Sequence, residues 1–293
     1  MSTAVRFNEV TKKFGSQVAL DEVTLEIPQG VVFALLGENG AGKTTSLRIM
    51  LGLTEADAGQ SEVLGLDSKT QGLEIRRRVG YVPEMPTMYD WMTVGEIGWF
   101  TAGFYSGGFL PRYNELAEQF GLDLSKKIKS ISKGMRAKVA LSLAMAHDPE
   151  LLVLDEPTSG LDPIVRREFL ESMVDLAADG KTVLLSSHQI NEVERVADMV
   201  AIIRGGKVVL VERLDTLKSE IQQLTVTLSN GMPEPPAIDG EVLREQRRER
   251  QWRVLARSLG PEQIEQLRGH ESVGSVDACS ASLEEIFVAY MKR

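Results

Sequence analysis

A glycine-rich segment that follows an apolar run near the amino terminus constrains the fold most. The run is Val31 to Leu36, and the segment is Gly37-Glu38-Asn39-Gly40-Ala41-Gly42-Lys43-Thr44. A phosphate loop lies between a strand and a helix and has the pattern of a glycine, four residues and then Gly-Lys-Ser/Thr. Backbone N–H groups and Lys43 attract phosphate oxygens, and the Thr44 hydroxyl can ligate Mg²⁺. The segment therefore predicts a nucleoside triphosphate site; the simpler alternative is a glycine turn before a helix.

The segments around this loop show two kinds of pattern. Residues 4–10 and 18–27 alternate apolar and polar side chains, which indicates antiparallel strands joined by a turn at 12–15. Mainly apolar runs predict buried strands at 31–36, 79–82, 151–154, 182–185 and 199–203. Helices are expected at 45–53, 163–178 and 190–197, a short strand at 59–66 and a charged connector at 75–78. The alternation of strands and helices predicts an α/β fold with a mainly parallel sheet covered on both faces.

The stretch from about 88 to 149 has a helical pattern. Thr93 and Glu96 have the spacing of a capping box, which opens a first helix. A second helix is expected between Pro111, a residue suited to a first turn, and Gly121, a residue suited to a helix end. Ser132 can cap a third helix.

The length of 293 residues exceeds that of a usual single domain. We expect a first domain at 1–218 and a small α+β accessory domain at 219–293. In the accessory domain, strands are expected at 224–228, at 272–278 and as a pair within 241–257, helices at 261–268 and 283–290, and a proline-rich link at 230–239.

Charged side chains follow two of the predicted buried strands. Asp155 and Glu156 come directly after residues 151–154. An aspartate in that place can bind Mg²⁺, and a glutamate one residue later can act as the general base for a water molecule. His188 follows the strand expected at 182–185, at the same edge of the sheet, where we expect it to contact a γ-phosphate. The alternatives are a solvated acidic strand end and a structural histidine.

These motifs, in this order, resemble those of ATP-binding cassette (ABC) ATPase subunits. The resemblance spans residues 3–215, and the segment near Ser132 is its most discriminating part. The motifs are Gly37 to Thr44, Ile131-Ser132-Lys133-Gly134-Met135, Leu151 to Glu156, Ser159-Gly160-Leu161-Asp162 and His188.

The resemblance implies a P-loop ATPase core with an antiparallel β subdomain and a helical subdomain. It also implies that two cassettes pair head to tail, with ATP and Mg²⁺ between the phosphate loop of one and the Ser132 segment of the other, and with Asp162 linking the two sites. A homodimer is the simpler expectation. The implied catalytic residues are Lys43, Glu156 and His188, and the implied Mg²⁺ ligands are Thr44, Glu84 and Asp155. The implied ATP contacts are Phe14, Gly37, Glu38, Asn39, Gly40, Ala41, Gly42, Lys43, Thr44, Thr45, Ser132, Lys133, Gly134 and Met135.

Three positions depart from the common pattern of this family. Lys133 and Met135 replace a glycine and a glutamine of the signature, and Glu84 replaces a glutamine. We expect a backbone at Lys133 that suits a lysine, whose ammonium either adds charge near the partner's γ-phosphate or faces solvent. Glu84 remains an oxygen ligand for Mg²⁺. The aromatic ring of Phe14 either stacks on adenine or packs under a turn.

The favoured function is an ATP-hydrolysing subunit of an ABC transporter. The sequence has neither the roughly 20 uninterrupted apolar residues of a membrane span nor the apolar core of a signal peptide. The permease is therefore expected to be a separate polypeptide, with this chain at the cytoplasmic face of the cell membrane. Leu283 to Phe287 resembles the tail of ATPases that serve bacterial exporters. Residues 91–109, with Trp91 and Trp99, are expected to dock on the permease, unless the tryptophans belong to the core.

The alternative is a soluble cassette protein that acts on ribosomes or DNA. A formal net charge of −9 argues against broad binding to nucleic acid, and no such partner is expected. Residues 241–257 are rich in arginine and could contact nucleic acid or lipid headgroups, but they also contain glutamates, as a solvated face does. A kinase would need a phosphoacceptor pocket, which no residues indicate. The single cysteine, Cys279, excludes an internal disulfide.

Overall fold

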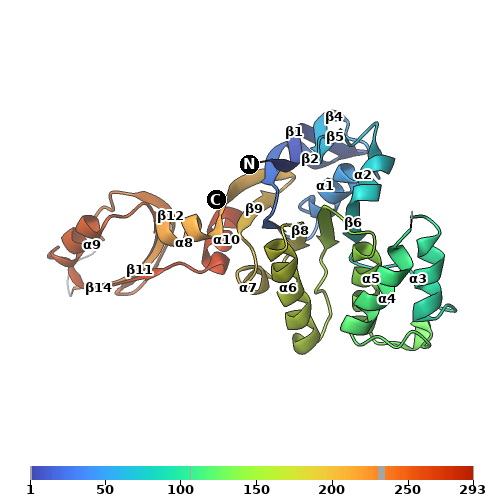
Figure 1. The fold of residues 1–293 in the computed structure, drawn as a ribbon. Coiled ribbons are helices and arrows are strands. Elements are labelled where there is room, and N and C mark those ends of the chain that lie inside the picture. Colours follow the sequence, from blue (N-terminus) through green and yellow to red (C-terminus); the bar gives the residue numbers. More distant parts are fainter. Residues whose placement is uncertain (1, 106, 230–234, 293) are drawn as a thin grey trace. The chain divides into compact units, whose positions relative to one another are not determined.

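The computed structural model describes residues 2–105, 107–229 and 235–292, and Figure 1 shows its fold. The chain divides into two compact units, Met1–Val211 and Glu212–Arg293. This division lies within strand β10 (Lys207–Arg213). Within the described ranges, no helix is long and apolar enough to cross a membrane.

The first unit begins with an antiparallel sheet in the order β2-β1-β4-β5. Its strands are β1 (Thr3–Phe14), β2 (Gln17–Pro28), β4 (Ala58–Val63) and β5 (Leu66–Asp67). Phe14 pairs with Gln17, so the turn is confined to residues 15 and 16 and is shorter than the predicted one. The single strand predicted at 59–66 is also wrong, because Leu64 adopts a positive φ of 51° and turns the chain between β4 and β5.

The second sheet has the order β10-β9-β3-β8-β7-β6. Its other strands are β3 (Val32–Leu36), β6 (Val79–Val82), β7 (Leu151–Asp155), β8 (Thr182–Ser187) and β9 (Met199–Arg204). Every pair from β9 to β6 is parallel, and most of these residues are buried, which is why the strands are continuous apolar runs. Helix α1 (Lys43–Met50) packs on β7, α2 (Gly72–Arg78) on β6, and α6 (Pro163–Ala178) on β8 and β3. The predicted α/β class is confirmed.

Helices α3 (Val94–Ala102), α4 (Phe109–Gln119) and α5 (Lys133–Met145) form the region predicted to be helical, after which the chain returns to β7 (Figure 1). The capping box is confirmed, since the Glu96 N–H donates to Thr93 Oγ1 at 3.1 Å and the Thr93 N–H donates to Glu96 at 2.7 Å. The helices share a hydrophobic core in which Tyr113 is fully buried. The Tyr113 hydroxyl donates to the Val94 carbonyl at 2.7 Å, which ties α4 to α3.

Several predicted boundaries are wrong. Residues 75–78 belong to α2 rather than to a connector, because Ile75 is fully buried and Arg76 donates to the Leu51 carbonyl at 2.8 Å. Helix α7 (Ile190–Val193) is half as long as predicted. Helix α1 begins and ends earlier than predicted, and α4 begins at Phe109 rather than Pro111.

The second unit contains a four-stranded antiparallel sheet in the order β12-β13-β11-β14. Its elements are α8 (Leu214–Glu220), β11 (Ile221–Leu228), β12 (Glu241–Arg248), β13 (Gln251–Arg257), α9 (Pro261–Arg268), β14 (Val273–Ser280) and α10 (Leu283–Lys292). Helix α9 packs on β14, and α10 packs on β12 and β13. The strands and helices predicted here are present, whereas β10 and α8 had no predicted counterpart. Of the predicted link at 230–239, residues 230–234 lie outside the described residues.

Candidate functional site

The phosphate loop joins β3 to α1, and two of its glycines are required by the geometry of the backbone. Gly42 has a φ of 112°, and a Cβ atom there would lie 2.6 Å from the Ala19 carbonyl oxygen. A Cβ atom on Gly37 would lie 2.6 Å from the Ile203 carbonyl oxygen. Any other residue at these positions would therefore collide with backbone. The loop lies close to β2 and β9 as a result, and its N–H groups precede the first turn of α1.

The candidate catalytic residues follow four neighbouring strands. The loop follows β3, His188 follows β8, Asp155 and Glu156 lie at the end of β7, and Glu84 follows β6. Because these strands are adjacent and parallel, their carboxyl ends meet at one edge of the sheet. The topology thus gathers residues that are more than one hundred positions apart in the sequence.

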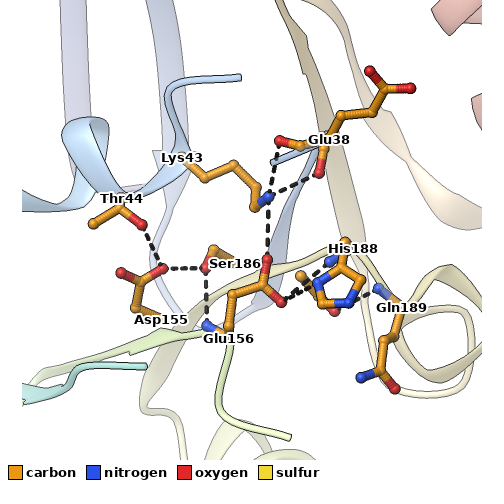
Figure 2. Close-up of polar contacts among 10 residues, drawn as sticks. Glu38, Lys43, Thr44, Asp155, Glu156, Ser186, His188 and Gln189 are labelled. Atoms are coloured by element: carbon orange, nitrogen blue, oxygen red, sulfur yellow. Dashed lines mark hydrogen bonds and ion pairs between the residues drawn. The ribbon is translucent and has the colours of Figure 1, made fainter. Parts of the chain in front are cut away.

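Lys43 and Glu156 form a buried ion pair at the centre of the site (Figure 2). Lys43 Nζ lies 3.1 Å from Glu156 Oε1, and the exposed fractions of the two side chains are 6% and 8%. Lys43 also donates to the carbonyl oxygens of Gly37, at 2.8 Å, and Glu38, at 3.3 Å. The Glu38 carboxylate points away from this contact. The lysine is therefore held over the loop by the loop's own backbone and by a carboxylate from β7.

Asp155 is linked to both neighbouring elements. The Thr44 hydroxyl donates to Asp155 Oδ1 at 3.2 Å, and the Ser186 hydroxyl donates to the same oxygen at 2.6 Å. Ser186 also accepts the Glu156 N–H at 3.0 Å. The sequence analysis did not select Ser186; its only signal was a polar residue at the end of a buried strand. This serine fixes the orientation of both carboxylate residues.

Thr44 and Asp155 place two hard oxygen atoms within hydrogen-bonding distance of each other, and such atoms suit Mg²⁺. Among the described residues, no group of three or more His, Cys, Asp or Glu side chains could hold a metal ion by itself. Mg²⁺ in proteins keeps several waters and takes further ligands from a substrate's phosphates. The residues present therefore fit a magnesium ion that binds together with a nucleotide.

Glu156 adopts a backbone conformation that is rare for its residue type. Its φ is 49°, in the left-handed region that costs a non-glycine residue roughly 1–2 kcal/mol. His188 contacts it twice: the backbone N–H donates to Glu156 Oε2 at 3.3 Å, and Nδ1 lies 2.7 Å from the same oxygen. With Glu156 ionised, the second contact requires the proton to be on Nδ1. The Glu156 carboxylate is thus held between Lys43 and His188.

A cavity of about 500 Å³ adjoins these residues. Its lining is Phe14, Gln17, Ala19, Asn39, Gly40, Gly42, Lys43, Thr44, Thr45, Glu84, Glu156, Ser159 and His188. Phe14 is 52% exposed at the end of β1, and Lys12 Nζ lies 5.3 Å from the centroid of its ring. A ring this exposed is available for stacking, which does not fit the alternative of packing under a turn.

The segment from Ser132 to Met135 is not among the described residues that line this cavity. Ser132 caps α5, because its Oγ accepts the Met135 N–H at 3.2 Å. Lys133 is the first residue of that helix, so the expectation of a backbone suited to lysine is confirmed. Its ammonium lies beside Gly160: a Cβ atom added there would be 2.4 Å from Lys133 Nζ. Asp162 caps α6 by accepting the N–H groups of Ile164 and Val165.

Comparison with known proteins identifies relatives of this chain. Residues 20–159 match the family model described as "ABC transporter". The bacitracin transport ATP-binding protein BcrA of Bacillus licheniformis is 37% identical over 221 residues, which are 74% of this chain and 72% of that protein. Nod factor export ATP-binding protein I of Rhizobium etli is 33% identical over 75% of this chain and 71% of that protein. The probable multidrug ABC transporter ATP-binding protein YbhF of Escherichia coli is 34% identical, but the match covers only 38% of its length.

Solved structures match a similar share of the chain. The ATP-binding subunit of an ABC transporter superposes with a TM-score of 0.67 at 32% identity, covering 74% of this chain and 92% of the other. The dimeric cassette MJ0796, in a post-hydrolysis state with ADP and phosphate bound, matches with a TM-score of 0.66 at 26% identity, covering 72% and 98%. By sequence, by fold and by the residues gathered at the phosphate loop, the chain belongs to the ABC transporter family as an ATP-binding and ATP-hydrolysing subunit.

Proposed function

We propose that this chain hydrolyses MgATP to drive export through a separate transmembrane permease, at the cytoplasmic face of the membrane. The observation that supports this most is the Lys43–Glu156–His188 contact series at the phosphate loop, in a chain related to export ATP-binding proteins. Export is inferred from these relatives, and the cargo would be selected by the permease.

The hydrolysis step would use the residues at the four strand ends. Glu156 accepts a proton from the attacking water, and the Nδ1 contact with His188 orients its carboxylate. Lys43 and the N–H groups of the loop stabilise the charge of the β- and γ-phosphates. Thr44, Asp155 and Glu84 would hold the magnesium ion, which neutralises charge on the phosphate oxygens. Ser186 bonds both the Asp155 carboxylate and the Glu156 N–H, and so keeps these two residues in position relative to each other.

The site of one chain would be completed by a second cassette. Ser132 caps the N-terminus of the 13-residue helix α5, where the remaining N–H groups and the helix dipole favour an anion. Since this segment does not line the chain's own ATP cavity, we infer that it contacts the γ-phosphate bound by its partner. Hydrolysis would then remove the charge that joins the pair, and the pair would open.

The permease would dock on an aromatic surface of the helical region. This surface consists of Tyr89, Trp91, Trp99 and Phe104, whose exposed fractions range from 50% to 72%. Tyr89 is in ring contact with Trp91 and with Phe100, and Phe100 is in ring contact with Phe104. Exposed fractions of 64% for Trp91 and 67% for Trp99 do not fit a role in the core. Exposed apolar surface of this kind marks an interaction site.

Fractionation of cells tests the transport function. The chain should be recovered with membranes when its permease is co-expressed, and should lose this association when Trp91 and Trp99 are replaced by serine. An Ile164→Ser variant is the control, since Ile164 is 73% exposed but lies on α6. Salt-sensitive co-sedimentation with ribosomes, without membrane recruitment, would contradict the proposal and favour the alternative of a ribosome-associated ATPase.

A further inference from the structure

The two faces of the sheet in the second unit differ sharply in chemistry. One face is apolar and forms the core with α9; its residues include Leu224, Val226, Trp252, Val254 and Val276. The other set of alternate residues is polar except for Leu255, which is buried. It forms three cross-strand rows, which are Arg244-Leu255-Gln223-Cys279, Gln246-Arg253-Thr225-Asp277 and Arg248-Gln251-Thr227-Ser275. Side chains directly opposite one another share a face of a sheet, so these rows form one mainly polar face.

A small pocket of about 150 Å³ lies on this polar face. It is lined by Gln223, Arg244, Gln246, Arg253, Val254, Leu255 and Glu285. Arg253 is opposite Gln246, and Arg244 is two positions from Gln246 on the same strand, so the two arginines are diagonal neighbours. The polar residues that line the pocket are therefore two arginines, two glutamines and one glutamate.

The two guanidinium groups have no partner among the described residues. Other arginines of this unit are engaged: Arg257 pairs with Glu220 at 2.6 Å, and Arg250 donates to the Leu228 carbonyl at 3.1 Å. No ion pair or side-chain hydrogen bond within the described ranges involves Arg244 or Arg253, although Glu285 lines the same pocket. Glu285 instead accepts the N–H and hydroxyl of Ser282, at 2.9 and 3.0 Å, at the start of α10.

We propose that this pocket binds a phosphate group. A guanidinium group is planar and binds oxyanions through paired N–H groups. Two neighbouring guanidinium groups without partners repel each other, and an anion bound between them removes this repulsion. A single guanidinium group is enough to hydrogen-bond both oxygens of a carboxylate. A tetrahedral phosphate has enough oxygens for both arginines and for the amides of Gln223 and Gln246, which approach from separate strands. The two positive charges exceed the single negative charge of Glu285.

The phosphate group could belong to a small molecule or to a lipid headgroup, and two assays separate these sources. Inorganic phosphate is titrated calorimetrically into the full chain, with a non-hydrolysable ATP analogue saturating the phosphate loop. In parallel, co-sedimentation is measured with phosphatidylcholine vesicles with and without phosphatidylglycerol. The variants are Arg244→Gln and Arg253→Gln. The control is Arg248→Gln, which removes the same charge from the same face of β12 but outside the pocket.

Each outcome of these assays either supports or overturns phosphate binding by the pocket. Saturable binding of inorganic phosphate, weakened at least about tenfold by Arg244→Gln and by Arg253→Gln but not by Arg248→Gln, supports a site for a small phosphate ligand. The same pattern seen only with phosphatidylglycerol vesicles supports a headgroup site. Absence of binding in both assays overturns the proposal. Equal losses in all three variants also overturn it, because they would indicate diffuse attraction to a charged surface.

Discussion

Lys43 Nζ lies 3.1 Å from Glu156 Oε1, with both side chains more than nine-tenths buried. This ion pair places the carboxylate that we propose as general base beside the lysine that we expect to contact the phosphates. Both side chains can therefore act on the same γ-phosphate and its attacking water.

Glu156→Gln should bind ATP but hydrolyse it at least about 100-fold more slowly, because an amide cannot accept the proton of the attacking water. The variant should accumulate as an ATP-bound pair. Phosphate release measures the first effect, and size-exclusion chromatography with ATP measures the second. Glu118→Gln, an exposed glutamate on α4, is the matched control. Wild-type turnover in Glu156→Gln would remove Glu156 from the role of base.

Phe14→Ala should weaken ATP binding about three- to tenfold, as expected for the loss of one aromatic stacking contact. Phe14→Trp should retain the affinity of the wild type, because a larger ring stacks at least as well. Titration with a fluorescent ATP analogue measures both. If the alanine variant binds as tightly as the wild type, the exposed ring at the end of β1 does not contact adenine.

The sequence was sufficient to predict the residues that end the central strands, because fully buried parallel strands have unmistakable apolar runs. Helix α2 and Ser186 were missed for different reasons. Residues 75–78 are mostly arginine, and their helical state depends on a contact between Arg76 and the distant Leu51 carbonyl. Ser186 reaches Asp155 only because β8 pairs with β7, and this pairing depends on the order of strands in the sheet. Long-range pairing of this kind leaves no local pattern.

Lys133→Ala should weaken ATP-dependent pairing of cassettes about tenfold, if its ammonium contacts the partner's γ-phosphate. Lys133 lies at the start of α5 and beside Gly160, within a segment that we assign to the interface. Analytical ultracentrifugation of the Glu156→Gln background with ATP measures the pairing. Lys129→Ala, an exposed lysine that precedes α5, is the control. Unchanged pairing and ATP affinity would show that Lys133 only faces solvent.

Glu84→Gln should leave ATP binding within about twofold of the wild type and change turnover only modestly, because the amide oxygen remains a ligand for Mg²⁺. Glu84 is exposed and lines the ATP cavity after β6. Nucleotide binding is measured at several Mg²⁺ concentrations. A collapse of ATP binding in this variant would mean that the carboxylate charge itself is needed.

The stability of the helical region should fall in mild acid because of His147. Burial lowers the pKa of His147, whose ring stacks on Tyr105 with centroids 4.6 Å apart. In the unfolded chain a histidine has a pKa near 6.5. As the pH falls through that value, the unfolded chain takes up a proton that the folded chain resists, so the free energy of unfolding decreases until the folded pKa is passed.

Urea unfolding of wild type and His147→Phe at pH 7.5 and 5.5 tests this expectation. Phenylalanine keeps the stacked ring but does not titrate, so the variant should lose less stability than the wild type between the two pH values. Tyr105→Phe keeps the stack and the histidine, and should retain the pH dependence of the wild type. If His147→Phe and the wild type lose stability equally, the acid sensitivity has its origin in the carboxylates, such as Glu150, whose pKa is lowered by the hydrogen bond from Arg78.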